Sequence, residues 1–409
     1  MQSKKAQPVL GLLKIRAWIA PLLLLLAHNA WGETIKIGLS GPFSGGSSPM
    51  GESMRNGVRL AVEEINGIGG IHGRDIELLE RDDQASNELG ARLAQELTQA
   101  RVAATIGIVN TGVGLASIDF YQKAKTPLLI AVSTGTVLTK KYAPPAASEN
   151  YIFRVSPTLD LEARMLAADL KRKGLHKIAI LADATPYGDA GLAAFSEQAR
   201  QAGLLLVSQM RFKIGDTDMR GQLQHAQTNG AQALLAWGIG PELATIARNL
   251  HSMNWKIPLF GSWTLSMRNF IDGAGKSGEG ASMPQTFIQD AGSTAKNSFL
   301  LAYKRRFSTD LIPSPMSAAQ GYDGMHLLAL AMRQARRLDG EAIRLALENL
   351  TMRYQGVITS YEKPFTANDH DAITANMMLM GRVVAGRVDY AYAEDQQRSA
   401  LLRVKQKGN

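Results

Sequence analysis

Residues 35–65, IKIGLSGPFSGGSSPMGESMRNGVRLAVEEI, decide the fold. The stretch begins with a short apolar run, rich in isoleucine, that predicts a buried strand. Its second half places four apolar side chains on one face of a helix: Met54, Val58, Ala61 and Ile65. Glycines and hydroxyls fill the junction between the two elements. In an α/β protein a junction of this kind is where a small ligand is usually held.

The same alternation of strand and helix continues along the chain. Four strand–helix repeats in one direction predict a parallel sheet with right-handed crossovers. After a loop at residues 140–151 the rhythm restarts and predicts a second α/β unit built like the first. Two helices, 297–307 and 317–338, carry apolar faces that we expect to pack on the first unit. The tail, residues 377–393, alternates like a β-hairpin.

Residues 1–32 have the pattern of a secretory signal peptide. Basic residues precede the apolar run WIAPLLLLLA, and a small-residue segment follows it, so Glu33 is the expected first residue of the mature chain. The apolar run is much shorter than the ~20 residues that span a bilayer, which disfavours the alternative of a retained membrane anchor.

Cysteine content and charge exclude several classes of protein. The chain has no cysteine, so it forms no disulfide, thiolate metal site, cysteine nucleophile or lipidated cysteine anchor. We therefore expect a freely soluble protein in a bacterial periplasm. The formal charge is +9, and it falls to +5 without the four basic residues of the signal peptide. The remaining basic residues are scattered at helical spacing, which indicates solvated helix faces and no nucleic-acid partner.

Residues 35–83 resemble the opening of the periplasmic binding proteins for branched-chain amino acids and related amides. The block with INGIGGIHGR at residues 65–74 is the most specific part of the resemblance, which is looser after Trp255. The resemblance covers most of the mature chain in the order of the family. It continues through residues 106–117, 126–139, 151–163, 177–191 and 317–332.

This resemblance implies an α/β fold with two Rossmann-like lobes, each with a parallel central sheet. A hinge of several strands would join the lobes, which close on a ligand like a Venus flytrap (type I periplasmic binding fold). The chain would cross between lobes near Val155, Met283 and Gly356. The implied divisions are a signal peptide at 1–32, a first lobe at 33–154 and 284–355, and a second lobe at 155–283 and 356–409.

Three loops of the first lobe, at residues 41–51, 109–114 and 132–136, each follow a strand and open a helix. Glycines allow close approach of the main chain, hydroxyls add donors, and helix N-termini present free N–H groups. These loops predict a wall that binds a carboxylate or amide oxygen without an arginine. For any one residue, an ordinary helix cap or turn is the alternative. By resemblance the ligand-binding candidates are Ser48 at the entrance, Asn110, Thr111, Ser133, Thr134 and Thr136.

The second lobe contributes aromatic candidates. By resemblance Tyr187 closes over the ligand, although packing at a helix start is its alternative. Ile239 or Gly240 is expected to face the cleft while Trp237 packs beside the sheet. Trp263 is a further candidate for contact with the ligand. Asp183 fits a helix cap or hinge hydrogen bond better than a ligand contact.

The segment GSWTL at residues 261–265 lacks an acid. In the family that this chain resembles, proteins that bind amino acids often hold the ammonium group of the ligand with an acidic residue near this position. A buried ammonium without a carboxylate partner is strongly unfavourable. Therefore Asp323, or another acid, substitutes from elsewhere, or the ligand is not a simple α-amino acid. Asp323 has a structural alternative, that of tying the lobe together.

These observations predict the periplasmic substrate-binding component of an ABC importer, a monomer that binds a small amino acid, amide or carboxylate and partners membrane permease subunits. We expect no enzyme, cofactor or metal site, because the chain has no GxSxG or HExxH motif and its histidines are dispersed. The alternatives are presentation of the ligand to a sensor kinase and, less favoured, an exported α/β enzyme. The fold also resembles the core of sugar-responsive repressors, but a signal peptide stands in place of their DNA-binding headpiece.

Overall fold

The computed structural model describes residues 2–3, 33–401 and 403–406. Apart from residues 2 and 3, the predicted signal peptide therefore lies outside the described residues. None of the helices within the described ranges is long and apolar enough to cross a membrane.

The first sheet has five parallel strands in the order β2-β1-β3-β4-β5. Its central strands are almost wholly buried, because helices cover both faces. The predicted parallel sheet is confirmed. The strands are β1 (Ile35–Gly41), β2 (Ile76–Asp82), β3 (Ala104–Gly107), β4 (Leu128–Ile130) and β5 (Ile152–Arg154).

Helices from both ends of the chain cover this sheet. The late helix α12 lies along α2, and glycines make the approach close. A Cβ on Gly57 would overlap the carbonyl oxygen of Ala318, and one on Gly321 would overlap that of Met54. The expected packing of the late helices on the first unit is confirmed. These helices are α2 (Ser48–Gly67), α3 (Asn87–Gln99), α4 (Thr111–Lys123), α5 (Val137–Lys140), α11 (Thr294–Phe307), α12 (Pro315–Gln334) and α13 (Gly340–Glu348).

The second sheet has seven strands in the order β14-β13-β10-β9-β8-β6-β7. Its first five strands in chain order are parallel and repeat the arrangement of the first sheet, while β13 and β14 form the predicted antiparallel hairpin on its edge. The strands are β6 (Lys177–Asp183), β7 (Leu205–Phe212), β8 (Ala233–Trp237), β9 (Leu259–Gly261), β10 (Ser282–Gln285), β13 (Leu379–Val384) and β14 (Arg387–Tyr390).

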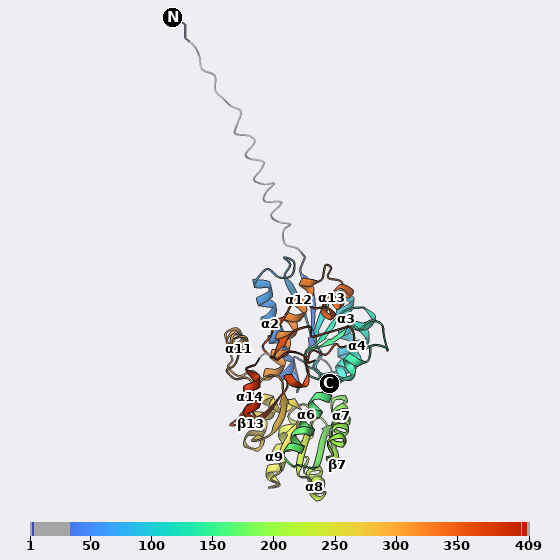
Figure 1. Cartoon of the computed structure of the whole chain (residues 1–409), viewed down its shortest axis with the longest axis vertical. Helices are drawn as coiled ribbons and strands as arrows, with labels where there is room; N and C mark the ends of the chain where they lie inside the picture. Colours follow the sequence, from blue (N-terminus) through green and yellow to red (C-terminus); the bar gives the residue numbers. More distant parts are fainter. Residues whose placement is uncertain (1, 4–32, 402, 407–409) are drawn as a thin grey trace.

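The two sheets occupy opposite ends of the folded chain, with α2, α3 and α12 at one end and β7, α8 and α9 at the other (Figure 1). The remaining elements are α6 (Leu159–Arg172), α7 (Pro186–Ala202), α8 (Arg220–Thr228), α9 (Glu242–Ser252), α10 (Arg268–Ala274) and α14 (Ala393–Ser399), the 3₁₀ turns η1 (Trp263–Ser266), η2 (Gly275–Gly278) and η3 (Ala375–Met377), and the short hairpin β11 (Tyr354–Gln355) and β12 (Ser360–Tyr361).

Segments distant in sequence meet at the β5 edge of the first sheet. The main chain at 370–372 runs beside the end of β5, with bonds of 2.9 Å from Arg154 N–H to the His370 carbonyl and from Ala372 N–H to the Arg154 carbonyl. The buried Arg154 guanidinium also pairs with Asp371 at 2.7 Å. This ion pair, removed from water, fixes the place where the chain leaves the first sheet.

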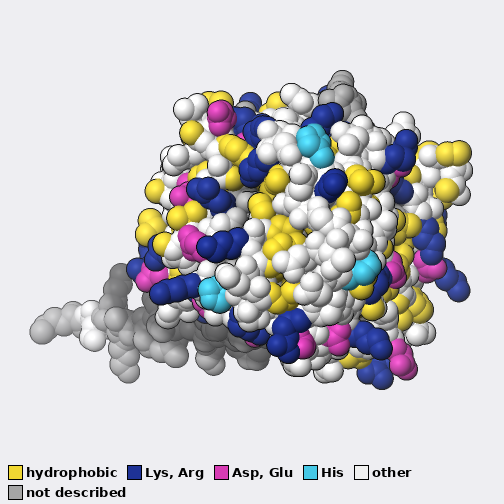
Figure 2. All heavy atoms as spheres, turned by 90° about the horizontal axis from the view of Figure 1, so that it is seen from below, with side chains coloured by type: hydrophobic (Ala, Val, Ile, Leu, Met, Phe, Trp, Pro, Cys, Tyr) yellow, Lys and Arg dark blue, Asp and Glu magenta, His cyan; other side chains and the backbone are white. Residues whose placement is uncertain are grey.

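The face at the second-sheet end carries basic and acidic side chains interspersed around an uncharged centre (Figure 2). On this face, charges of one sign do not gather into a continuous stripe. The arrangement matches the solvated, mixed-charge surface expected from the scattered basic residues.

Candidate ligand-binding site

Each sheet has one point where its strand order reverses. In the order 2-1-3-4-5 the reversal lies between the first and third strands, so the loops that follow these strands diverge and leave a crevice. The reversals fall between β1 and β3 in the first sheet and between β6 and β8 in the second. Ligands of open α/β sheets bind at such points, at the carboxyl ends of the strands.

The loops from both reversal points line one cavity of about 540 Å³. This volume suits a small molecule. Helices α4 and α7, which begin at the two reversal points, approach each other beside it. The lining residues are Gly46, Ser47, Gln84, Ala85, Asn87, Asn110, Thr111 and Gly112 from the first-sheet side, and Asp183, Thr185, Pro186, Tyr187, Ile214, Gly215, Ile239, Gly240, Pro241 and Glu242 from the other.

The N-terminus of α4 opens into this cavity without a side-chain cap. Asn110 occupies the N-cap position, but its side chain donates to Ser47 Oγ at 3.2 Å and accepts no bond from the helix. The first N–H groups of an α-helix have no partner within the helix, and they carry the positive end of its dipole. Since Asn110, Thr111 and Gly112 all line the cavity, these groups are available to a carboxylate or amide oxygen.

The N-terminus of α7 is, by contrast, already occupied. Thr185 Oγ1 accepts from the N–H groups of Tyr187 and Gly188, while Asp183 Oδ1 accepts from Gly188 N–H at 3.1 Å. Asp183 Oδ2 accepts from Ile239 N–H at 3.2 Å. Asp183 thus assists Thr185, the N-cap residue of α7, and also bonds the loop after β8, as the expected hydrogen-bonding role implies; it lines the cavity as well. Of these two helix ends, only that of α4 is open to a ligand.

A buried polar layer adjoins Tyr187. Thr134 lies in the loop after β4, Glu162 in α6 and Trp263 in η1, and each is at most 3 % exposed. Glu162 Oε2 accepts from Trp263 N–H at 3.3 Å. Burial raises the pKa of the Glu162 carboxyl to about 8, while the hydrogen bond from Trp263 N–H, the neighbouring Thr134 hydroxyl and the charge of Arg154 oppose the rise.

With this geometry in view, comparison with known proteins identifies the family. Residues 34–387 match the model of a family described as periplasmic binding protein. The chain belongs to this family. The leucine-, isoleucine-, valine-, threonine- and alanine-binding protein of Pseudomonas aeruginosa is 24% identical over 326 residues, which cover 78% of this chain and 84% of that protein.

Solved structures of this family share the fold. A type 1 periplasmic binding protein from Bordetella pertussis superimposes with a TM-score of 0.80 at 26% identity, covering 88% of this chain and all of that one. A branched-chain amino acid transporter substrate-binding protein from Streptococcus pneumoniae, in complex with isoleucine, gives a TM-score of 0.75 at 25% identity, covering 87% and 98% of the two chains. The type I periplasmic binding fold implied by the sequence is confirmed.

Several residues expected at the cleft lie together. Asn110, Thr111, Tyr187 and Ile239 line the 540 Å³ cavity. Ser133 is buried just behind it, where its hydroxyl hydrogen-bonds that of Thr111 at 3.2 Å. Thr134 and Trp263 belong to the buried layer beside Tyr187. Trp237 is fully buried in β8, as expected.

Three candidates lie elsewhere. Ser47 lines the cavity, whereas Ser48, the first residue of α2, does not. Thr136 faces a different cavity, next to Lys140 and Asp160.

Asp323 is the third of these, and its carboxylate is committed to the main chain of another segment. It accepts from the N–H groups of Val357 at 2.8 Å and Ile358 at 3.0 Å, and from the Tyr361 hydroxyl at 3.1 Å. These contacts agree with the alternative expected from the sequence, that Asp323 has a structural role. Asp323 is therefore left out of the ligand site that we propose.

Glu162 was missed from the sequence. Glu162 lies in the first turn of α6, where an acidic residue commonly interacts with the helix dipole. Thr158 caps the same helix, so the sequence looks like an ordinary helix start. Only its position in the sequence could have indicated Glu162, because the segment SPTLDLEA directly follows the expected crossing between lobes at Val155.

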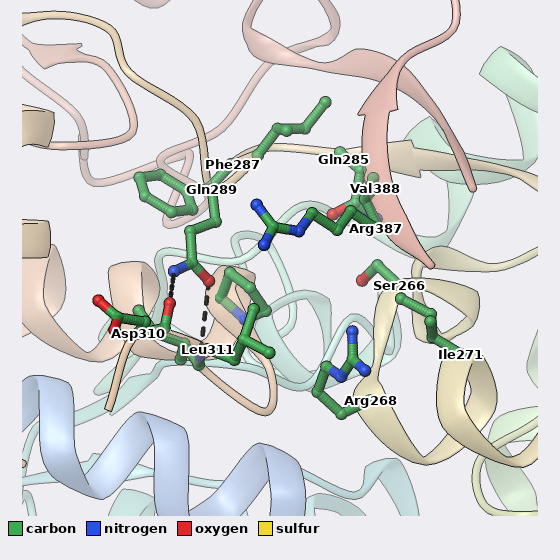
Figure 3. A pocket seen from close by; sticks show the side chains of 13 residues that line it. Ser266, Arg268, Ile271, Gln285, Phe287, Gln289, Asp310, Leu311, Arg387 and Val388 are labelled. Carbon is green, nitrogen blue, oxygen red and sulfur yellow. Dashed lines mark hydrogen bonds between the residues drawn. The ribbon is translucent and has the colours of Figure 1, made fainter. Parts of the chain in front are cut away.

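A second cavity, of about 430 Å³, lies between η1, α10, β14 and the loop before α12 (Figure 3). Two of its polar side chains already have partners. The Gln289 amide bonds the Asp310 carbonyl and the Ile312 N–H, and the Arg268 guanidinium bonds Asp272 and the Gly386 carbonyl. None of the predicted ligand residues lines this cavity. Within the described ranges no three His, Asp or Glu residues lie close enough to hold a metal ion.

Proposed function

We propose that this protein is the periplasmic substrate-binding component of an ABC importer. Its ligand is a small amino acid, amide or carboxylate held in the 540 Å³ cavity. The observation that carries this proposal is the uncapped N-terminus of α4, which opens into a cavity where the reversal points of both sheets meet. Such a place can neutralise a ligand oxygen with N–H groups and hydroxyls, without an arginine.

Proteins of the same family support this class of ligand. The Pseudomonas aeruginosa relative is named for the binding of five small amino acids, and the Streptococcus pneumoniae structure contains isoleucine. Both are described by roles in binding, and the latter as part of a transporter. For this chain we propose membrane permease subunits as the partners.

We further propose that the ligand is enclosed by hinge closure. The lobes are residues 33–154 with 284–355, and 155–283 with 356–409, crossing near Val155, Met283 and Gly356. Contacts to α4 come from one lobe and contacts to Tyr187 and Ile239 from the other, so a ligand makes its full set only in the shut form. Those contacts shift the population towards closure, and release follows when the lobes reopen.

A screen of the mature protein, residues 33–409, tests the function. Thermal-shift and calorimetric measurements against amino acids, their amides and aromatic acids are expected to give one class of ligand that raises the melting temperature. NMR of the recovered ligand is expected to show it chemically unchanged. Stabilisation by none of these compounds, or turnover of the ligand, would contradict the proposal.

A further inference from the structure

Three polar atoms from three different elements lie buried and unsatisfied beside the proposed site. Among the described residues, Glu162 Oε1, Thr134 Oγ1 and Tyr187 Oη have no hydrogen-bond partner of acceptable geometry. Burial and then the charge of Glu162 raise the pKa of Tyr187, and the Thr134 hydroxyl acts on both groups, so the three side chains are neighbours. Tyr187 also lines the cavity, which connects this cluster to it.

No cation in the described structure pairs with Glu162. Arg154 is the basic group that acts on it, but this guanidinium is committed to Asp371, Thr139 and the Gly135 carbonyl. The groups that face Glu162 are the Trp263 N–H of η1 and the Tyr187 side chain of α7, and neither is a cation. Strand β10, which also contacts α6, has no charged residue. A fully buried carboxylate without a cation is unfavourable, so the Glu162 carboxyl stays protonated unless a positively charged donor arrives.

We propose that Glu162 recognises an ammonium group of the ligand, so that the protein selects amino acids over the corresponding acids. This inference rests on the proposed function and names the class of ligand. The α4 N-terminus meets the carboxylate of the ligand, and Glu162 Oε1, with the hydroxyls of Thr134 and Tyr187, meets its ammonium. One end of the zwitterion is thus held by N–H groups and the other by a carboxylate.

Proton release follows from this assignment. Burial keeps the free Glu162 carboxyl protonated at neutral pH, with a pKa of about 8, and an ammonium beside it favours the ionised form. Binding therefore expels a proton. Between pH 6 and 8 the affinity for an amino acid is expected to rise by up to about tenfold per pH unit.

The test uses matched pairs of ligands that differ only in the ammonium: leucine with 4-methylpentanoate, and phenylalanine with 3-phenylpropanoate. Wild-type protein is expected to bind the amino acid of at least one pair more than tenfold tighter than its partner. Glu162→Gln is expected to lower that amino-acid affinity at least tenfold and to abolish its pH dependence. Affinity for the acid without an ammonium is expected to remain within about threefold. Glu197→Gln, the same change on an exposed part of α7, is the matched control and changes none of these values.

Calorimetry in phosphate and Tris at pH 7 gives a second readout that needs no variant. Wild-type protein is expected to release close to one proton per amino acid bound. Equal binding of both members of a pair, or no proton release, overturns the role of Glu162 while the proposed function stands. If no member of any pair binds, the proposed function and the inference fail together. Circular dichroism of Glu162→Gln confirms that the variant is folded.

Discussion

Thr134 carries a buried hydroxyl that the described protein leaves without a hydrogen-bond partner. Thr134→Val keeps the shape and removes this hydroxyl. We expect ligand binding to weaken by ~1–3 kcal/mol, because a ligand group loses its partner, while the free protein keeps or gains stability. Titration calorimetry and urea denaturation measure the two effects.

Thr139→Val provides the matched control. The Thr139 hydroxyl donates to Asp371 at 2.9 Å and accepts from Arg154 at 2.8 Å, within a buried network. The same substitution is therefore expected to destabilise the fold and to leave the affinity of the folded protein nearly unchanged. If the two variants behave alike, Thr134 has a structural role and does not contact the ligand.

Glu162 makes the stability of the free protein depend on pH. Its folded-state pKa of about 8 lies above the ordinary value of 4.5, so the folded state holds a proton that the unfolded state releases. Stability is greatest below pH 4.5 for this group and is lost as pH rises towards 8. Asp83 and Asp323, whose pKa values burial raises to about 6, act mainly below pH 6.

Comparison of wild type with Glu162→Gln therefore assigns to Glu162 the decrease in the free energy of unfolding between pH 6 and 8. Urea denaturation at intervals of half a pH unit is expected to show a decline in wild type that the variant lacks. Parallel curves for the two proteins would show that the carboxyl is not held protonated.

At the scale of elements, Asp323 joins α12 to the segment at 357–358 that we propose as part of the hinge. A Cβ on Gly356 would overlap the Asp323 carboxylate, so the two elements fit with no spare room. Asp323→Ala leaves the buried N–H groups of Val357 and Ile358 without an acceptor. We expect a loss of at least about 2 kcal/mol in the free energy of unfolding.

The same variant separates the two roles considered for Asp323. A structural residue lowers stability but leaves the ligand affinity of the folded protein within a few-fold of wild type. A ligand-binding residue would lower affinity strongly at temperatures where the variant is fully folded. Asp218→Ala, which removes an exposed ion pair with Arg220, is the control and is expected to cost less than about 1 kcal/mol.

The contrast between predicted and missed features follows from the range of the interactions. Apolar periodicity is local, so it correctly predicted the strands around Ile37 and Ile180, the helix of Met54 and Ile65, and the parallel sheets. The strand-end loops of the site followed, because parallel strands bring their carboxyl ends to one edge. The partners of Asp323 lie more than thirty residues away, and Glu162 meets Trp263 across about a hundred. No local pattern encodes such contacts.

At the scale of the whole molecule, the described structure buries the cluster of Thr134, Glu162 and Tyr187 away from solvent. Tyr187 and Trp263 are 5 % and 3 % exposed, although both belong to the part of the chain that we assign to the cleft. A ligand cannot reach the cluster of Thr134, Glu162 and Tyr187 unless the halves separate. We therefore infer that the free protein populates an open form that ligand binding depletes.

Small-angle scattering on the mature protein, with and without the ligand found by screening, tests this motion. The radius of gyration is expected to fall on saturation to the value calculated for residues 33–406 of the described structure. The two halves, bridged by the ligand, are then expected to melt in one transition that is stabilised by about 2.7 kcal/mol at a hundred times Kd. An unchanged radius with a tightly bound ligand would mean a rigid cavity filled through local fluctuation. In that case contacts from opposite halves would not drive closure, and the substitutions at Thr134 and Glu162 would act on affinity alone.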